Sequence, residues 1–110
     1  MLVDGQPSRS CLMFAAQSEG TDITTIEGLA DDDGTPHPIQ QAMMDAHGFQ
    51  CAFCAPGFLM STLALLDENP DPTTDEIRDE LSGNLCRCTG YQSIVAGVER
   101  AVELMKEDRS

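Results

Sequence analysis

Four cysteines stand in two closely spaced pairs, each just ahead of a segment with helical character. Cys51 and Cys54 are separated by two residues, whereas Cys86 and Cys88 are separated by one. The backbone N–H groups at a helix N-terminus are unpaired and carry roughly half a positive charge, so they favour anionic ligands. Two such helix starts brought together predict a pocket for a negatively charged, thiolate-bound metal centre.

Three kinds of site fit these spacings. Four thiolates around a [2Fe–2S] core form the first, and Arg87, between two of the cysteines, adds a positive charge beside it. A structural zinc site in an interaction module uses the same thiolates, although a one-residue spacer is less usual for zinc. Disulfides or free thiols are the third. The spacing favours iron–sulfur and keeps zinc as the alternative.

The composition is that of one compact domain with a strongly acidic surface. The 110 residues are 41% apolar and 23% charged, with a formal net charge of −13. Such a negative net charge repels phosphate backbones and anionic lipid surfaces, so we expect no nucleic-acid or membrane partner. No stretch approaches the ~20 apolar residues of a membrane span, and the N-terminus lacks a signal-peptide pattern. We therefore expect a cytoplasmic protein whose cysteines bind metal.

The elements that must position the cysteines change in character near residues 31–38. Before this point the alternation of apolar and polar residues predicts short strands at 1–4, 9–14 and 22–26, the first two joined by a turn at Asp4-Gly5. After it the apolar spacing predicts helices at 36–47, 56–68, 73–83 and from 89 onwards. Thr73-x-x-Glu76 and Thr89-x-x-Gln92 are capping-box patterns that begin the last two helices.

Two longer stretches contain the cysteine pairs. They are Gln50-Cys51-Ala52-Phe53-Cys54-Ala55-Pro56-Gly57 and Leu81-Ser82-Gly83-Asn84-Leu85-Cys86-Arg87-Cys88-Thr89-Gly90-Tyr91. They resemble the motifs of the iron–sulfur subunit in the xanthine oxidase family of molybdenum hydroxylases. Such subunits occur in aerobic carbon-monoxide dehydrogenases, aldehyde oxidoreductases and N-heterocycle dehydrogenases. Residues 22–29 are similar to the link between the two domains of that subunit, so the resemblance covers essentially the whole chain.

The resemblance implies an α+β fold, with a four-helix [2Fe–2S]-binding domain at 31–110 preceded by part of a ferredoxin-like β-grasp domain at 1–30. It implies that Cys51, Cys54, Cys86 and Cys88 bind one cluster, and that Gln50 and Cys88 contact the pterin of a molybdenum cofactor. A separate large subunit would hold this molybdopterin. Electrons would pass from it through the cluster to a second cluster and to FAD on a medium subunit. The chain would be a relay and not the catalyst.

The sequence departs from the family pattern in a shortened ferredoxin-like domain and in two substitutions. Cys11 stands where the ferredoxin-like domain has its fourth ligand, but the other three ligands would lie upstream of Met1, so we expect a truncated chain. Cys11 is then a possible ligand of an incomplete second cluster, or a buried small apolar residue. The family usually has Gly in place of Ala52, and in place of Ala55 a Thr that would cap the next helix. His37 and His47 are interpreted as helix-end residues rather than ligands.

Overall fold

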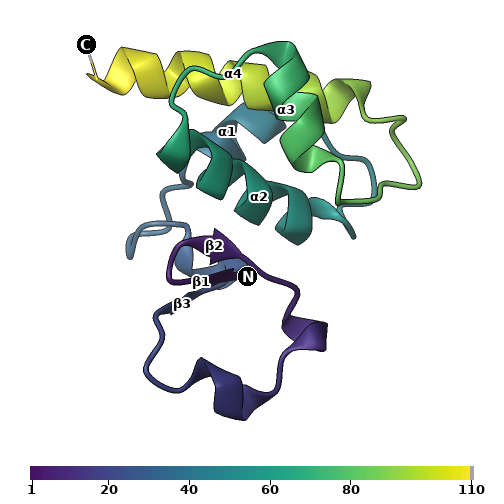
Figure 1. Cartoon of the computed structure of the whole chain (residues 1–110). Coiled ribbons are helices and arrows are strands. Elements are labelled where there is room, and N and C mark those ends of the chain that lie inside the picture. Colours follow the sequence, from purple (N-terminus) through teal and green to yellow (C-terminus); the bar gives the residue numbers. More distant parts are fainter. Residues whose placement is uncertain (110) are drawn as a thin grey trace.

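The largest elements of the chain are four α-helices, and a small antiparallel sheet lies beside them in the computed structural model, which describes residues 1–109 (Figure 1). The helices are α1 (Pro38–Asp45), α2 (Ala55–Glu68), α3 (Thr74–Leu81) and α4 (Gln92–Arg109). The fold is therefore α+β, as the sequence predicts, and each expected helix is present with ends shifted by up to three residues. None of these helices is long and apolar enough to cross a membrane.

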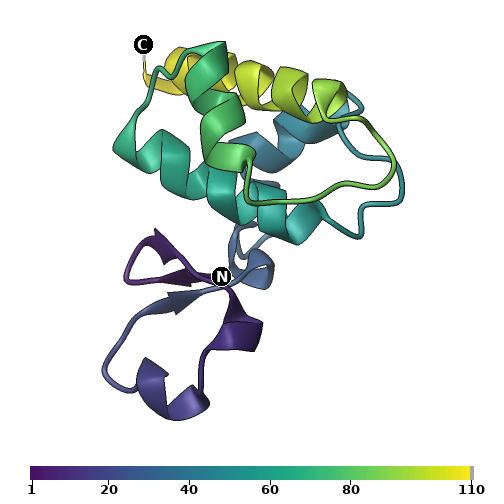
Figure 2. The same cartoon turned by 45° about the vertical axis from the view of Figure 1, so that its right-hand side comes forward.

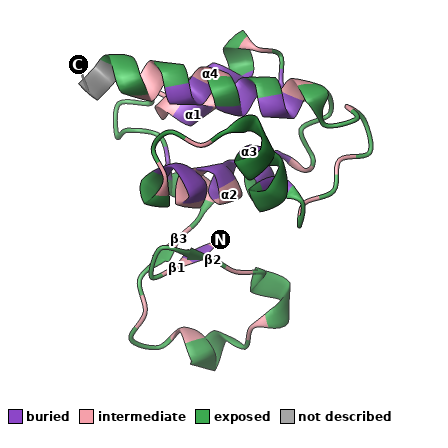
Figure 3. Ribbon diagram, turned by 45° about the horizontal axis from the view of Figure 1, so that its top comes forward, coloured by how far each residue is buried: buried purple, intermediate pink, exposed green. Residues whose placement is uncertain are grey.

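The core lies where the apolar sides of the helices meet, and the sheet end of the chain is mostly exposed (Figure 3). Helix α1 packs mainly against α4, and α2 packs against α3. Each helix contributes at least one side chain that is almost completely buried: Ile39, Phe58, Ile77, Ile94 and Val98. Burying a large apolar side chain contributes about 1.5–3 kcal/mol, so these contacts hold the helix starts in place.

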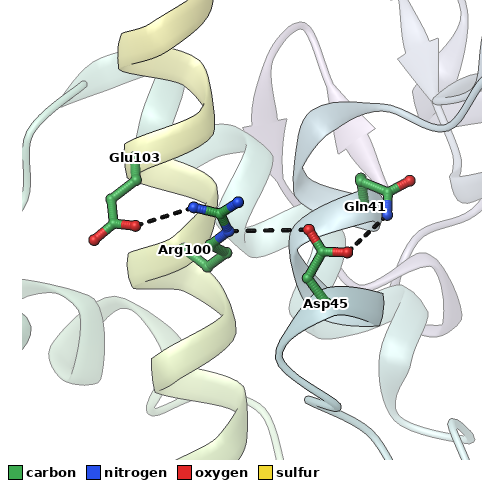
Figure 4. A network of polar contacts seen from close by, with 4 residues as sticks. All are labelled: Gln41, Asp45, Arg100 and Glu103. Carbon is green, nitrogen blue, oxygen red and sulfur yellow. Dashed lines mark hydrogen bonds and ion pairs between the residues drawn. The ribbon is translucent and has the colours of Figure 1, made fainter.

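Polar contacts on the surface also join α1 to α4 (Figure 4). The Arg100 guanidinium lies 3.9 Å from Asp45 and 3.2 Å from Glu103. The amide of Gln41 donates to Asp45 at 2.8 Å. Exposed ion pairs contribute only about 0–1 kcal/mol, so the network orients two helices that apolar packing already holds together.

The two capping-box patterns have different outcomes. Thr73 caps α3 as predicted: its hydroxyl accepts from the Glu76 N–H at 3.2 Å, and the Glu76 carboxylate accepts from the Thr73 N–H at 3.0 Å. The prediction for Thr89 is wrong, because α4 begins only at Gln92 and the Thr89 hydroxyl bonds within its own loop. The physical reason is a competing partner, described with the site below.

Both histidines lie at the ends of α1, as predicted. His37 is the N-cap residue, and its Nδ1 accepts from the Ile39 N–H at 3.2 Å. His47 follows the C-cap with a φ of 51°, and the Gly48 N–H reaches back to the Met43 carbonyl at 2.9 Å. This is a Schellman ending, in which a left-handed residue turns the chain sharply away from the helix. It directs the next segment towards the first cysteine pair.

The sheet has the strand order β2-β1-β3, with β1 (Leu2–Val3) in the centre, β2 (Gln6–Pro7) and β3 (Ile23–Thr24). Strands within 1–4 and 22–26 are confirmed, as is the turn at Asp4-Gly5, where both residues have positive φ. The predicted strand at 9–14 is wrong. A two-residue turn returns the chain at once, so the second strand comes at Gln6–Pro7 and Ser10–Leu12 forms a 3-10 helix.

Candidate metal centre

Two loops meet at one end of the helices. Residues 46–54 connect α1 to α2 and residues 82–91 connect α3 to α4, and they run side by side in both views (Figures 1 and 2). Phe58 of α2 lies between them, with its ring centroid 6.3 Å from the ring of Phe49 in the first loop and 6.3 Å from that of Tyr91 in the second. This buried side chain therefore anchors both loops to the core.

Polar contacts add to this anchoring. The Gln50 amide donates to the Cys88 carbonyl at 3.2 Å, which joins the two loops directly. The Ser93 hydroxyl, in the first turn of α4, donates to the Gly48 carbonyl at 2.9 Å. The structure thus places Gln50, which the resemblance singled out, against the backbone of one predicted ligand.

The four thiols form two pairs, and each pair takes one cysteine from each loop. The sulfurs of Cys51 and Cys88 lie 3.5 Å apart and are exposed. Cys54 and Cys86 are half-buried, and their thiols lie close enough for each to shift the pKa of the other. All five cysteines of the chain lie in its described part, and each is an unbridged thiol.

The arrangement in pairs bears on which metal the thiols fit. A structural zinc site requires four ligands around one ion, but among the side chains described, those of residues 1–107, no three Cys, His, Asp or Glu groups gather closely enough to hold a single ion. A [2Fe–2S] cluster requires two thiolates on each of two irons, because the sulfides complete the coordination. The donor set of two thiol pairs therefore fits a binuclear iron–sulfur centre.

The half-buried thiols of Cys54 and Cys86, the inner pair, differ strongly in pKa. The Thr89 hydroxyl, which donates to the Cys86 sulfur, lowers the pKa of that thiol to about 7. Burial raises the pKa of the Cys54 thiol to about 11, and the nearby Cys86 adds to the effect. The thiolate is the form that binds metal, and Cys86 reaches it at a lower pH than Cys54.

The exposed thiols of Cys51 and Cys88, the outer pair, also differ in pKa. The backbone N–H of Phe53 lowers the pKa of Cys51, and the hydrogen bond with Cys88 lowers it further. That same bond raises the pKa of Cys88, which donates its proton to the neighbouring sulfur. In each pair one thiol therefore loses its proton more easily than its partner.

The backbone of the first loop explains one departure from the family and corrects another. Ala52 has a φ of 65°, a left-handed conformation that favours glycine, which the family usually has there. The N-cap of α2 is Cys54, and its side chain makes no capping bond. Ala55 is therefore the first helical residue and is buried, so the expectation that a Thr at this position would cap the helix is wrong.

Three residues that position the second loop were not anticipated. The Asn84 amide donates to the Ser61 hydroxyl of α2 at 3.0 Å, and the Arg9 guanidinium donates to the Gly83 carbonyl at 2.8 Å. Both contacts hold the chain just before Cys86. Arg9 is 74 positions from Gly83 and had no local pattern to indicate it, whereas an Asn soon after a helix end is a common turn signal.

Cys11 lies apart from the two pairs. It is exposed, on the 3-10 helix Ser10–Leu12, so the interpretation as a buried apolar residue is wrong. It lines a hollow between the sheet segment and α2, together with Arg9, Gly57 and Asn84, and no other cysteine lines that hollow. The described structure therefore supplies no further thiol beside it.

Comparison with known proteins identifies the class to which this site belongs. Residues 25–99 match the family model described as the [2Fe-2S] binding domain, and the chain belongs to that family. This confirms the family predicted from the residues around the cysteines. The match includes both loops and all four paired thiols.

Individual relatives are similar over most of the chain. The small subunit of nicotine 6-hydroxylase from Paenarthrobacter nicotinovorans is 53% identical over 89% of this chain, and the small FeS subunit of nicotinate dehydrogenase from Eubacterium barkeri is 48% identical over 94%. The chain spans only 58% and 65% of the lengths of these two relatives. A crystal structure of quinoline 2-oxidoreductase from Pseudomonas putida 86 superposes with a TM-score of 0.89, at 40% identity over 99% of this chain and 68% of that one.

Proposed function

We propose that the chain is the electron-transfer iron–sulfur subunit of a molybdenum hydroxylase complex, with one [2Fe–2S] cluster on Cys51, Cys54, Cys86 and Cys88. The observation that carries this proposal is the formation of two thiol pairs, each with one member from each loop. Membership of the [2Fe-2S] binding domain family and the similarity to small subunits of nicotine and nicotinate hydroxylating enzymes support it. When bound, the cluster supplies one-electron transfer.

The residues of this chain then have distinct roles. The outer pair, Cys51 and Cys88, lies exposed and faces the electron donor, whereas the inner pair, Cys54 and Cys86, is half-buried against the core. Gln50 fixes the carbonyl of Cys88, and by similarity both residues contact the pterin of the molybdenum cofactor. The substrate reaction takes place on another subunit, because the site offers ligands for a metal centre and no described group for substrate chemistry.

Two exposed apolar side chains beside the site support a docking role. Phe53, between the first two ligands, is 93% exposed, and Leu85, just before the third, is 83% exposed. Large apolar side chains gathered at a functional edge usually lie against a partner. We propose that they lie against the molybdopterin-binding large subunit, and that a second cluster and an FAD-binding medium subunit accept the electrons.

The division of the chain into two parts and its location in the cell belong to the same proposal. The chain divides into a β segment at 1–30 and a helical cluster-binding domain at 31–110, which agrees with the change from strands to α-helices between Ile23–Thr24 and Pro38–Asp45. The protein functions in the cytoplasm. Its five unbridged thiols fit a reducing compartment.

Metal analysis of the purified protein tests the proposal. We expect about two irons and two acid-labile sulfides per chain, visible absorption bands, and an electron paramagnetic resonance signal after reduction. Serine at any of the four paired positions should remove most of the iron, while Cys11→Ser, the matched control, should retain it. A colourless protein with one zinc per chain would contradict the proposal.

A further inference from the structure

In the second loop, the hydroxyl of Thr89 donates a hydrogen bond to the sulfur of Cys86, a proposed cluster ligand. Thr89 Oγ1 donates its hydrogen to Cys86 Sγ at 3.1 Å and accepts from the Tyr91 backbone N–H at 3.1 Å. A hydroxyl has one hydrogen to donate and two lone pairs with which to accept. Because one lone pair holds the Tyr91 N–H, the orientation of the hydroxyl is set and its hydrogen points to the sulfur.

Tyr91 holds this arrangement against the core. Its backbone is left-handed, with a φ of 75°, and its ring packs at 6.3 Å against Phe58, which is 1% exposed. The Tyr91 hydroxyl accepts from the Cys86 backbone N–H at 3.2 Å. Cys86 is therefore held at both its amide and its sulfur by residues three to five positions further along the chain.

A hydrogen bond to a ligand sulfur acts on the two redox states unequally. Reduction adds negative charge to the centre, so a donor at sulfur stabilises the reduced state more than the oxidised state and raises the reduction potential. Thr89 and Cys86 are both half-buried, and reduced contact with water strengthens such a bond. Among the described side chains of residues 1–107, no other hydroxyl or amide hydrogen bonds to a cysteine sulfur.

We infer that Thr89 is a positioning residue that raises the reduction potential of the iron–sulfur centre by donating a hydrogen bond to Cys86 Sγ. The inference rests on the proposed function, since it requires that Cys86 be a cluster ligand. The failed helix cap belongs to the same arrangement: the Thr89 hydroxyl accepts from the Tyr91 N–H, before α4 begins, and its hydrogen goes to the sulfur three residues earlier.

Redox titration of the cluster-loaded protein tests the inference. Thr89→Val keeps the shape of the side chain and removes the hydroxyl, so the equilibrium constant for one-electron reduction should fall about tenfold, which is a potential ~59 mV lower. Thr89→Ser keeps the hydroxyl and should restore the wild-type potential. Thr74→Val is the matched control, because Thr74 bonds to Glu99 on α4 and contacts no cysteine; its potential should equal the wild type.

Iron and sulfide contents, measured first, separate this inference from the proposed function. If the wild type holds no iron, the proposed function fails and the inference fails with it. If wild type and Thr89→Val are equally loaded and their potentials agree, the inference alone is overturned. If the valine variant takes up no iron, Thr89→Ala takes its place in the titration: a potential below that of Thr89→Ser supports the bond, and equal potentials overturn the inference.

Discussion

Gly57 lies directly beneath the side chain of Asn84: a Cβ atom on Gly57 would stand 2.8 Å from Asn84 Oδ1. Helix α2 therefore needs a glycine in its first turn so that the asparagine of the second loop can reach Ser61. A contact of 2.8 Å is shorter than packed atoms tolerate, so any larger residue at position 57 must displace Asn84. Displacement of Asn84 would also disturb Cys86, which follows it by two residues.

Gly57→Ala should therefore destabilise the protein by about 0.5–1.5 kcal/mol, the usual contribution of one hydrogen bond, and should lower iron retention. Denaturant unfolding and iron analysis measure the two effects. Gly28→Ala is the matched control, because a Cβ there meets nothing within 4 Å. In a Gly57→Ala/Asn84→Ala double variant, the cost of the Gly57 change should nearly vanish; a fully additive cost would show that Asn84 is not the cause.

Ala52→Gly should stabilise the protein. Ala52 adopts a φ of 65°, where a side chain costs about 1–2 kcal/mol and glycine fits without strain. We expect a gain of about 1 kcal/mol in the free energy of unfolding, measured by denaturant titration. Ala64→Gly, in the middle of α2, is the control and should lose about 1 kcal/mol. A loss at both positions would contradict the left-handed assignment of Ala52.

Stability near pH 6 should depend on His37. Only unprotonated Nδ1 can accept from the Ile39 N–H, and burial lowers the pKa of His37, with Asp31 opposing that shift. The folded-state pKa lies below the unfolded value of about 6.5, so the cap contributes fully above pH 6.5 and is lost as the pH falls through the lowered value.

His37→Asn keeps an acceptor that does not titrate in this range. The difference in free energy of unfolding between the wild type and this variant, measured by thermal unfolding, should therefore be constant above pH 7. At pH 5 the wild type should have lost about 0.5–2 kcal/mol relative to the variant. The comparison between the two proteins cancels the acid sensitivity that the metal centre has in both. Parallel curves down to pH 5 would exclude a titrating cap at His37.

Removal of iron should loosen the end of the molecule where the loops meet. The proposed ligands come from both loops, so a bound centre joins them and stabilises the folded state by mass action. Treatment with a chelator and reductant should lower the thermal midpoint and increase amide hydrogen exchange in residues 46–54 and 82–91. The α1–α4 contact, which is held by buried side chains such as Ile39 and Val98, should keep its protection. Equal exchange in both forms would contradict the role of the loops.

Local patterns predicted the elements well where neighbours along the chain decide the outcome. Apolar spacing predicts all four helices because an amphipathic helix buries one stripe whatever its partner is. Thr73 and Thr89 show the limit of this reasoning, because both begin a capping-box pattern. The Thr73 hydroxyl accepts from the Glu76 N–H and caps α3. The Thr89 hydroxyl instead accepts from the Tyr91 N–H in its own loop and donates to the Cys86 sulfur.

The sequence by itself determined which side chains can bind a metal, their spacing and their place ahead of two helices, because residue types and short-range periodicity are local properties. Only the tertiary structure decided that Cys51 meets Cys88, 37 positions away, while Cys54 meets Cys86. It also decided that Arg9 and Asn84 hold the second loop. The two loops meet because both pack against Phe58 of α2, and no local pattern encodes the relative placement of segments so far apart in the chain.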